Sequence, residues 1–345
     1  MDALRTDCLV VGAGPAGLTA ARLLALKGRT VVVADPGGVA ANRLELLAPA
    51  SLATVAAVGL EPLLDDPRVA RRCHGIRRRR ASGAPEYEDF LRHPGCAGYV
   101  VDRAYFDARL RATALAAGVK FLRLRATGTT LDGGVICRDC DSGARRIVHA
   151  DAVIDATGRA AAIARRRGAR VTARDRMIAE LMEDAVADAS ADTASWLDYR
   201  SVESSWSYRI DGPGGRSQSW RVRASGAAAG DTLLSVDASM HVLSEAAGEG
   251  WIAVGDAAIA FDPIASQGLF NALSSALVAT GVVLSDRLSA AVARSYSDAV
   301  IATFLHCEAG RINVYNYKPF SPALQPSANS KTTAQDRSLI DHGRI

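Results

Sequence analysis

The sequence predicts an α/β fold in which a parallel sheet with covering helices is interrupted by an inserted antiparallel sheet. Residues 7–35 read as a strand, a glycine turn, an amphipathic helix and a second strand, and this order makes the two strands parallel neighbours. Residues 171–241 change to short alternating stretches between glycine-rich turns, which are typical of antiparallel strands. A buried strand and a long helix return at 250–286. The last core elements are therefore expected to rejoin the first layer.

This order divides the chain into three parts. A discontinuous α/β domain is expected over 1–170 and 242–318, with the inserted sheet over 171–241. The stretch 319–345 is rich in Ser, Asn and Thr and has few apolar residues. We therefore expect this tail to be poorly ordered.

The remaining elements of the first domain follow from hydrophobic periodicity. Residues 45–64 read as a loop that leads into a short helix. Residues 102–118 have the pattern of an amphipathic helix, with Gly118 as its stop. Two short strands expected to join the same sheet follow at 119–131 and 145–158.

The composition of the whole chain disfavours several classes of protein. Its 345 residues, of which 49% are hydrophobic, suffice to bury a sizeable core. The 41 basic and 37 acidic residues are scattered, which disfavours nucleic acid as a partner. There is no secretory pattern at the N-terminus, and no apolar run reaches the roughly 20 residues of a membrane-spanning helix. We expect a cytoplasmic protein without a transmembrane segment.

The cysteines are interpreted as ordinary thiols. Six cysteines in a chain of this length do not form the dense framework of a small secreted domain. Cys137 and Cys140 make a single C-x-x-C, a spacing that suits a metal or a redox pair. No second pair follows, and turn residues of a predicted hairpin adjoin this one. No metal site is expected.

A glycine motif predicts a dinucleotide site. Gly12, Gly14 and Gly17 form G-x-G-x-x-G directly after a strand and before a helix. Gly12 permits the tight turn, Gly14 lets the backbone approach a pyrophosphate, and Gly17 lets the helix pack closely on the strand. Asp35 ends the second strand, where its carboxylate can bind a ribose diol. This motif does not distinguish NAD from FAD.

A second segment distinguishes them. In GWIAVGDAAIAFDPIASQGLFNAL, a strand ends in Gly255-Asp256, and a loop carries Asp262-Pro263 and Gln267-Gly268 into a helix. This segment resembles the Gly-Asp motif of the single-component FAD-dependent monooxygenases and the related flavin-dependent halogenases. The resemblance implies that Asp256 holds the ribityl chain of FAD and that Pro263, Gln267 and Gly268 lie beside its isoalloxazine ring.

Weaker matches extend the resemblance. The segment ADAVIDATG resembles the strand-end Asp-x-x-Gly of the same proteins, which implies that Asp155 and Gly158 lie on the phosphate side of the cofactor. Arg43 and Arg103 match arginines that face the linking chain of FAD, although each could instead form a structural ion pair. The expected FAD-binding residues are Gly12, Gly14, Ala16, Gly17, Asp35, Arg43, Arg103, Asp155, Gly158, Asp256, Pro263, Gln267, Gly268 and Leu269.

For the substrate side, the pattern is most similar to the halogenase-like tryptophan hydroxylases of quinone-cofactor maturation. These have a tryptophan-rich strand, which here reads SSWSYRI. Trp206 and Tyr208 are therefore candidates to face a substrate, but residues two apart on a strand share a face that is equally suited to core packing. The inserted sheet and the C-terminal region are also short for these proteins.

Halogenation is a less favoured reading of the same fold. The resemblance implies that a halogenase needs a lysine in the first domain and a Trp-x-Trp-x-x-Pro signature, and this chain offers neither. Two of its lysines lie at the ends of core elements and two in the polar tail: Lys27, Lys120, Lys318 and Lys331.

Two groups of charged or titratable residues receive no catalytic role. Arg77 to Arg80 could bind a phosphate or an acidic partner, but consecutive strand residues point to opposite faces, so a solvated edge strand is expected. His74, His93 and His241 are candidate bases only because histidine titrates near neutrality. The catalytic residue is left open.

The resemblance implies an FAD-dependent monooxygenase that hydroxylates an aromatic or otherwise electron-rich organic substrate with NADH or NADPH and oxygen. Because only one glycine motif occurs, the nicotinamide cofactor is expected to bind transiently. Alternatives are a flavin-dependent reductase of the prenyl-reductase type, a halogenase, and a catalytically inactive flavin-binding partner protein. The substrate could be a small molecule, a carrier-bound intermediate or a residue of another protein.

Overall fold

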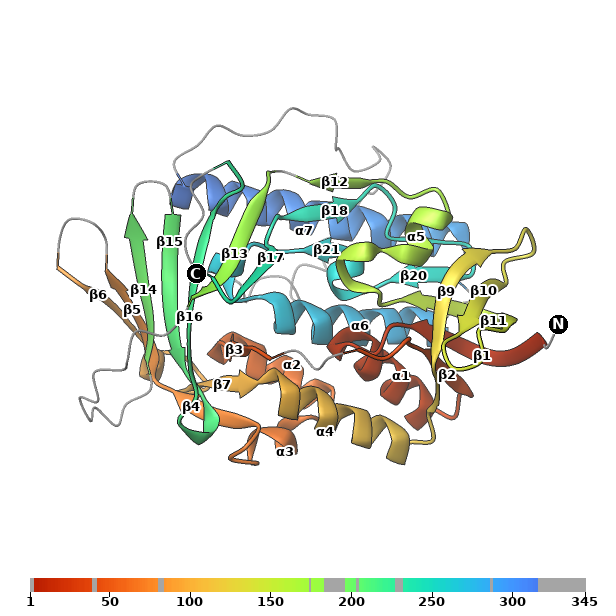
Figure 1. Cartoon of the computed structure of the whole chain (residues 1–345), viewed down its shortest axis with the longest axis horizontal. Coiled ribbons are helices and arrows are strands. Elements are labelled where there is room, and N and C mark those ends of the chain that lie inside the picture. Colours follow the sequence, from red (N-terminus) through yellow and green to blue (C-terminus); the bar gives the residue numbers. More distant parts are fainter. Residues whose placement is uncertain are drawn as a thin grey trace.

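The computed structural model describes residues 3–38, 42–79, 84–173, 175–182, 196–202, 205–226, 232–285 and 288–315. A parallel sheet forms the first layer, as the sequence predicts (Figure 1). Its strand order is β19-β20-β11-β1-β2-β8, and β1 is parallel to both β2 and β11. The strands are β1 (Ala3–Val11), β2 (Val31–Ala34), β8 (Lys120–Leu122), β11 (Arg145–Asp155), β19 (Ala247–Gly248) and β20 (Trp251–Ala253). A hairpin of β9 (Leu124–Thr129) and β10 (Val135–Asp139) extends β11.

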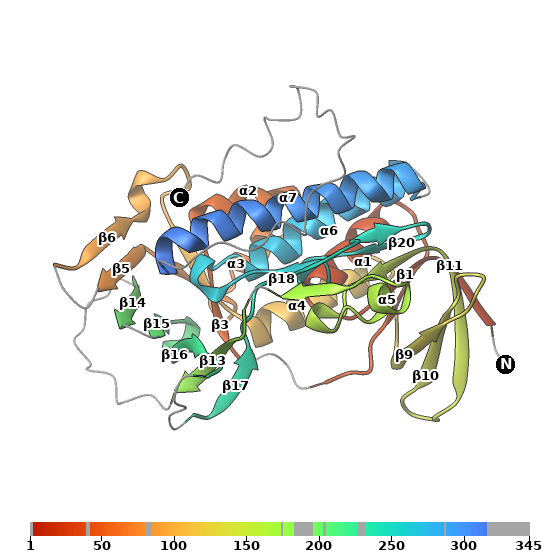
Figure 2. The same ribbon diagram turned by 90° about the horizontal axis from the view of Figure 1, so that it is seen from above.

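Helices on both sides of the sheet bury its apolar strands. Helix α1 (Pro15–Leu26) packs between α4 (Arg103–Ala116) and α6 (Gly268–Ser285). The small helix α5 (Ala162–Arg166) packs on β9, β11 and β20. The long helix α7 (Ala290–Tyr315), which was not predicted as a separate element, packs on β18 and β19 (Figure 2). The largest core cluster lies among these elements.

Within the described residues, one helix is long and apolar enough by composition to cross a membrane. This helix is α6, whose 18 residues have a mean hydropathy of 1.6. It was expected as a core helix, and it buries Leu269, Leu273 and Ala276 in the main core.

A second sheet of seven strands lies at the other end of the molecule from the β9–β10 hairpin (Figure 1). Its order is β17-β13-β16-β15-β14-β5-β6, and all neighbours are antiparallel except β14 and β5. The strands are β5 (Gly75–Arg79), β6 (Glu86–Asp89), β13 (Met177–Met182), β14 (Trp196–Val202), β15 (Ser205–Asp211), β16 (Ser217–Ala224) and β17 (Leu234–Asp237).

The predicted boundaries of the inserted sheet, 171–241, are corrected in one respect. Strands β5 and β6, which come from the first part of the chain, also belong to this sheet. Strand β5 pairs with β14 and so satisfies backbone groups that would otherwise lie at a sheet edge. The expectation that the arginine run forms a solvated edge strand was also wrong. Strand β5 has a neighbour on each side, Arg77 pairs with Asp198, and Arg78 pairs with Glu88. Arg80 lies outside the described residues.

Two small sheets and several short helices connect the layers. One sheet contains β3 (Leu44–Leu47), β7 (Gly98–Asp102) and β4 (Ala70–Cys73), and the other contains β12 (Val171–Ala173), β18 (His241–Leu243) and β21 (Ile259–Ala260). The short α-helices are α2 (Leu52–Ala57) and α3 (Glu61–Leu64). The 3-10 helices are η1 (Pro49–Ser51), η2 (Phe90–Arg92), η3 (Gly158–Ala160), η4 (Pro213–Gly215), η5 (Gly255–Ala257) and η6 (Pro263–Ala265). The predicted tail, 319–345, lies outside the described residues.

Candidate functional site

A cavity of about 520 Å³ opens at the carboxyl ends of β1, β2, β11 and β20. In open α/β sheets this edge is where ligands bind. The predicted residues that line it are Gly12, Gly14, Ala16, Asp35, Arg43, Arg103, Gly158, Asp256, Gly268 and Leu269. Segments far apart in the sequence therefore meet here.

The glycine loop has the close contacts that the motif predicts. Gly12 has a φ of 107°, and a Cβ on it would lie 2.3 Å from the Ala156 carbonyl oxygen. A Cβ on Gly17 would lie 2.1 Å from the Gly12 carbonyl oxygen. A Cβ on Gly14 would meet nothing within 4 Å, because Gly14 borders the cavity. Helix α1 begins there without a side-chain cap, so its first N–H groups are available to an anion.

Asp35 is fixed at the end of β2. Its Oδ2 accepts a hydrogen bond from Ala13 N at 2.8 Å, and its Oδ1 accepts one from Gly37 N at 2.7 Å. Each carboxylate oxygen keeps a second lone pair. The side chain lines the cavity and can therefore also accept from a ribose hydroxyl.

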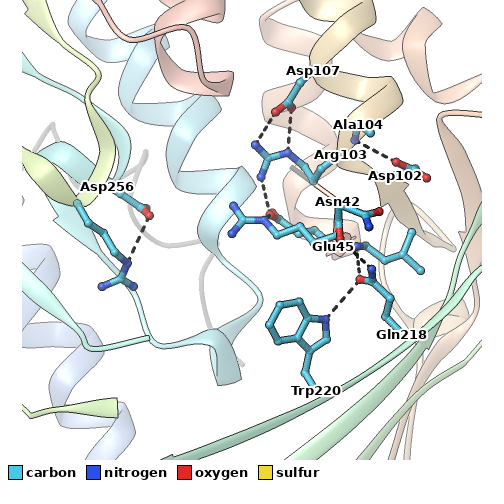
Figure 3. Close-up of polar contacts among 12 residues, drawn as sticks. Asn42, Glu45, Asp102, Arg103, Ala104, Asp107, Gln218, Trp220 and Asp256 are labelled. Carbon is cyan, nitrogen blue, oxygen red and sulfur yellow. Dashed lines mark hydrogen bonds and ion pairs between the residues drawn. The ribbon is translucent and has the colours of Figure 1, made fainter. Parts of the chain in front are cut away.

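Arg43 and Arg103 meet on one carboxylate, that of Glu45 (Figure 3). Arg103 Nη1 lies 2.5 Å from Glu45 Oε1, and Arg43 Nε lies 2.6 Å from the same oxygen. Arg103 also binds Asp107 through two hydrogen bonds of 2.9 Å. Burial by itself would raise the pKa of Glu45, but Arg103 and Arg43 together lower it. Glu45 is therefore an ionised group that pairs with two arginines of the cavity lining.

Glu45 was not among the site residues predicted from the sequence. The only signal was its position two residues after Arg43 in the segment ANRLELLAP. Residues two apart in an extended chain lie on the same side, so Arg43 and Glu45 do so where the chain enters β3.

The Gly-Asp motif contacts the glycine loop directly. Gly255 has a φ of 57°, and a Cβ on it would lie 2.9 Å from the Ala16 Cβ. Burial raises the pKa of the Asp256 carboxyl, and the charges of Arg159 and Arg43 oppose that rise. Arg159 Nε lies 3.9 Å from Asp256 Oδ2. Asp256 thus faces the cavity with a cation beside it.

His241 supports the same loop. Its Nε2 lies 3.0 Å from the Asp256 carbonyl oxygen, which can only accept, so Nε2 carries the proton. Its Nδ1 then faces Arg159 Nη1 at 3.5 Å as an acceptor. Burial and the Arg159 charge lower the pKa of His241. The neutral imidazole fits both contacts.

The structure does not bring every predicted residue to the cavity. Asp155 is fully buried, and its carboxylate accepts hydrogen bonds from the Thr157 N–H and hydroxyl and from the Ile163 and Ala164 N–H groups. It therefore positions the Gly158 turn and does not line the cavity. Pro263 and Gln267 also do not line it, and their contact with a flavin ring stays a prediction.

Trp206 and Tyr208 lie on the inner face of the second sheet. Their rings stack with centroids 5.7 Å apart, and Trp206 packs with Trp220 and Ile264 in a core cluster. Burial raises the pKa of Tyr208, and the negative charge of Glu45 raises it further. The aromatic pair is thus part of the core, and its Tyr208 end lies near the charged wall of the cavity.

Trp220 extends this aromatic face. Its Nε1 donates to Gln218 Oε1 at 3.4 Å, and the same oxygen accepts from Leu44 N at 2.8 Å. Figure 3 shows Trp220 on the side of Glu45 that faces the second sheet. The second sheet and β3 are therefore joined by polar contacts beside the cavity.

Other candidate groups lie away from the cavity. Lys27 and Lys120 are exposed and do not line it, and Lys318 and Lys331 lie outside the described residues. Cys137 is buried and Cys140 is exposed, so they do not form one site. Among the residues that the structure describes, no group of three His, Cys, Asp or Glu side chains could hold a metal.

These features fit FAD. The open face of Gly14, the uncapped start of α1 and the arginines suit a pyrophosphate, Asp35 suits a ribose, and Asp256 lies further along the same cavity. Residues 5–229 match the FAD binding domain family. The chain belongs to this family. FAD as cofactor, predicted from the sequence, is confirmed.

Curated relatives of this FAD binding domain protein match part of the chain. Digeranylgeranylglycerophospholipid reductase 2 of Methanosphaera stadtmanae is 32% identical over 171 residues, which cover 48% of this chain and 42% of that protein. Digeranylgeranylglycerophospholipid reductase 1 of Methanothermobacter thermautotrophicus is 32% identical over 174 residues, covering 47% and 41%. The match spans less than half the length of these relatives.

Solved structures share the fold over most of the chain. The flavin-dependent brominase Bmp2 has a TM-score of 0.72 at 19% identity, covering 90% of this chain and 88% of that chain. The peptidyl tryptophan dihydroxylase QhpG has a TM-score of 0.67 at 22% identity, covering 90% and 75%. A geranylgeranyl bacteriochlorophyll reductase-like protein of Thermoplasma acidophilum has a TM-score of 0.73 at 21% identity, covering 91% and 88%. The predicted fold class and the resemblance to flavoprotein oxidoreductases are confirmed.

Proposed function

We propose that this FAD-dependent oxidoreductase is a monooxygenase that hydroxylates an aromatic or otherwise electron-rich organic substrate with NAD(P)H and oxygen. The observation that carries the proposal is the aromatic face of the second sheet beside a charged cavity wall. Tyr208 is close enough to Glu45 for the carboxylate to raise its pKa, and it stacks on Trp206. A planar substrate with a polar group can stack on the aromatic face and place its polar group at the charged wall of the cavity.

The residues have the following proposed roles. When bound, FAD supplies electron transfer from NAD(P)H and activation of oxygen. Gly12, Gly14 and the start of α1 bind its pyrophosphate, while Asp35 and Asp256 bind its ribose and ribityl hydroxyls.

The remaining groups shape the reaction space. The N-terminus of α6 at Gly268 places partial positive charge at the cavity, which stabilises negative charge that develops there. Buried Val254 and Leu269 line the cavity and exclude water. Trp206 and Tyr208 orient the substrate.

A reductase that saturates prenyl chains is the second candidate. It is favoured by the two curated relatives, whose names describe reductases of a digeranylgeranyl lipid. The charged groups around Asp256 and Glu45 favour the first candidate, because a hydrocarbon chain would remove them from water and offer them no polar contact. Halogenation is disfavoured, since none of the lysines that the structure describes lines the cavity.

Consumption of oxygen and NAD(P)H by the FAD-loaded protein tests the proposal. Phenols and indoles are presented as substrates, with a geranylgeranyl lipid in a separate arm. We expect oxygen uptake, NAD(P)H oxidation and hydroxylated product in equal amounts with an aromatic substrate. Saturation of the lipid without oxygen would favour the reductase, and no substrate-dependent turnover in either arm would favour an inactive partner protein.

A matched pair of variants tests the aromatic face. Trp206→Phe should raise KM for the aromatic substrate up to about tenfold, because it weakens the stacking that positions Tyr208 and such aromatic contacts contribute about 0.5–1.5 kcal/mol. Trp196→Phe is the control, since Trp196 lies on the same sheet but contacts Tyr87. Equal effects of the two variants would contradict the assignment of Trp206.

A further inference from the structure

A second, basic cavity adjoins the flavin cavity. It has a volume of about 630 Å³ and is lined by Arg125, Arg165 and Arg166, with no acidic residue in its lining. The two cavities share Arg125, Ala126, Ala160 and Ala162. The two cavities are therefore continuous.

No carboxylate among the described residues neutralises the arginines of this cavity. The buried arginines Arg103 and Arg223, by contrast, each pair with a carboxylate. No ion pair joins Arg125, Arg165 or Arg166 to an acidic residue in the described part of the chain. Arg166 is held in place by hydrogen bonds to the carbonyl oxygens of Thr127 and Ala162, at 3.2 and 2.7 Å. Its guanidinium is thus pre-positioned.

Strand pairing adds further positive charge on the same face. Arg138 of β10 is directly opposite both Arg125 of β9 and Arg145 of β11. Directly opposite residues of antiparallel strands share a face, and like charges placed in this way destabilise a sheet. All three side chains are exposed. An anion bound across this face would remove the repulsion.

FAD does not account for these charges. Its pyrophosphate is provided for by the glycine loop, the start of α1, Arg43 and Arg103. FAD carries no phosphate beyond this pyrophosphate. The basic cavity therefore offers an anion site in addition to the one for the pyrophosphate.

We propose that the basic cavity binds the phosphorylated adenosine of NADPH, with Arg125, Arg165 and Arg166 contacting its 2′-phosphate. Guanidinium groups bind phosphate through paired, charge-assisted hydrogen bonds, and an arginine is the usual means of accommodating this 2′-phosphate. The inference rests on the proposed function in that a reductant is needed, and it selects NADPH over NADH.

Calorimetric titration of the FAD-loaded protein tests the site without turnover. The probes are 2′,5′-ADP, 3′,5′-ADP and 5′-AMP. We expect 2′,5′-ADP to bind at least about tenfold more tightly than 5′-AMP, because charge-assisted hydrogen bonds contribute about 1.5–3 kcal/mol each. Raising the salt concentration should weaken this binding. Equal binding of 2′,5′-ADP and 5′-AMP would overturn the proposal, and a preference for 3′,5′-ADP would overturn the assignment to NADPH.

Substitutions locate the binding. Arg165→Gln with Arg166→Gln should weaken 2′,5′-ADP binding about tenfold or more, with FAD content unchanged because both side chains are exposed. Arg92→Gln is the control, since Arg92 is exposed in η2 and lines neither cavity. Wild-type affinity in the double variant would sink the proposal. If 2′,5′-ADP binds as expected but no substrate supports turnover, the site stands and the proposed function fails.

Discussion

Arg311 of helix α7 and Asp262 of the loop before α6 form a buried ion pair with Nη2 and Oδ2 2.9 Å apart. Only 5% of the Arg311 side chain and 1% of the Asp262 side chain are exposed. Asp262 also caps η6 by accepting from Ile264 N at 2.9 Å. Arg311 binds Asp175 as well, at 2.6 Å. The C-terminal helix therefore fixes the loop that leads to Gly268.

Arg311→Met should destabilise the protein by about 3–5 kcal/mol, because it removes the cation beside the buried carboxylate of Asp262. Chemical denaturation measures this loss. The double variant Arg311→Met with Asp262→Asn removes both charges and should recover part of it. If Arg311→Met unfolds like the wild type, α7 does not stabilise this loop.

Gly14→Val should abolish FAD binding while leaving the fold intact. The φ of −76° and ψ of 177° at Gly14 suit any residue, and the new side chain would enter the cavity without meeting protein atoms. Saturating FAD stabilises the wild type by about 4 kcal/mol at a thousand times its Kd, and this shift in thermal stability should vanish in the variant. Gly17→Ala is the contrast, because its Cβ would collide with the Gly12 carbonyl and destabilise the protein even without FAD. A yellow Gly14→Val protein would contradict the proposed phosphate site.

Asp155→Asn should cost about 3 kcal/mol of stability. Its carboxylate accepts four hydrogen bonds, and the amide nitrogen of asparagine cannot accept those from Ile163 and Ala164. Urea denaturation of the protein without FAD gives the value. Asp151→Asn, an exposed position on the same strand, should change it little. A fall in FAD affinity with unchanged stability would instead indicate direct contact with the cofactor.

The protein should lose stability as the pH falls from about 7.5 to about 5.5, in part through His241. Burial and Arg159 lower the pKa of His241 below its ordinary value of 6.5 in the folded protein. Below pH 6.5 the imidazole of His241 therefore takes up a proton more readily in the unfolded chain than in the folded protein. The free energy of unfolding falls as a result, until the pH passes the folded pKa. His241→Gln keeps a donor for the Asp256 carbonyl but does not titrate, so its stability should fall less over this range. His306→Gln, at an exposed position on α7, should behave as the wild type.

Much of the fold follows from local sequence signals. The strand, glycine turn and helix at Gly12 to Gly17 were predicted because hydrophobic periodicity and glycine geometry act over a few residues. Glu45 was missed, since its role depends on Arg103, which is 58 positions away in the sequence. The position of Asp155 off the cavity depends on α5 folding back over the strand end, and no local pattern reports that contact. Contacts between segments that are far apart in the sequence could not be predicted from such local patterns.

The parallel pairing of β5 with β14 has a consequence for exchanging specificity between related enzymes. Arg77 and Asp198, which join these strands, are 121 positions apart in the sequence. A chimera that transplants only the segment from β13 to β17 would carry a sheet evolved against a different β5, and its outer strands would not match. An exchange of substrate preference therefore requires both segments to be moved together. Hybrids in which β5 and β14 come from different proteins should fold poorly.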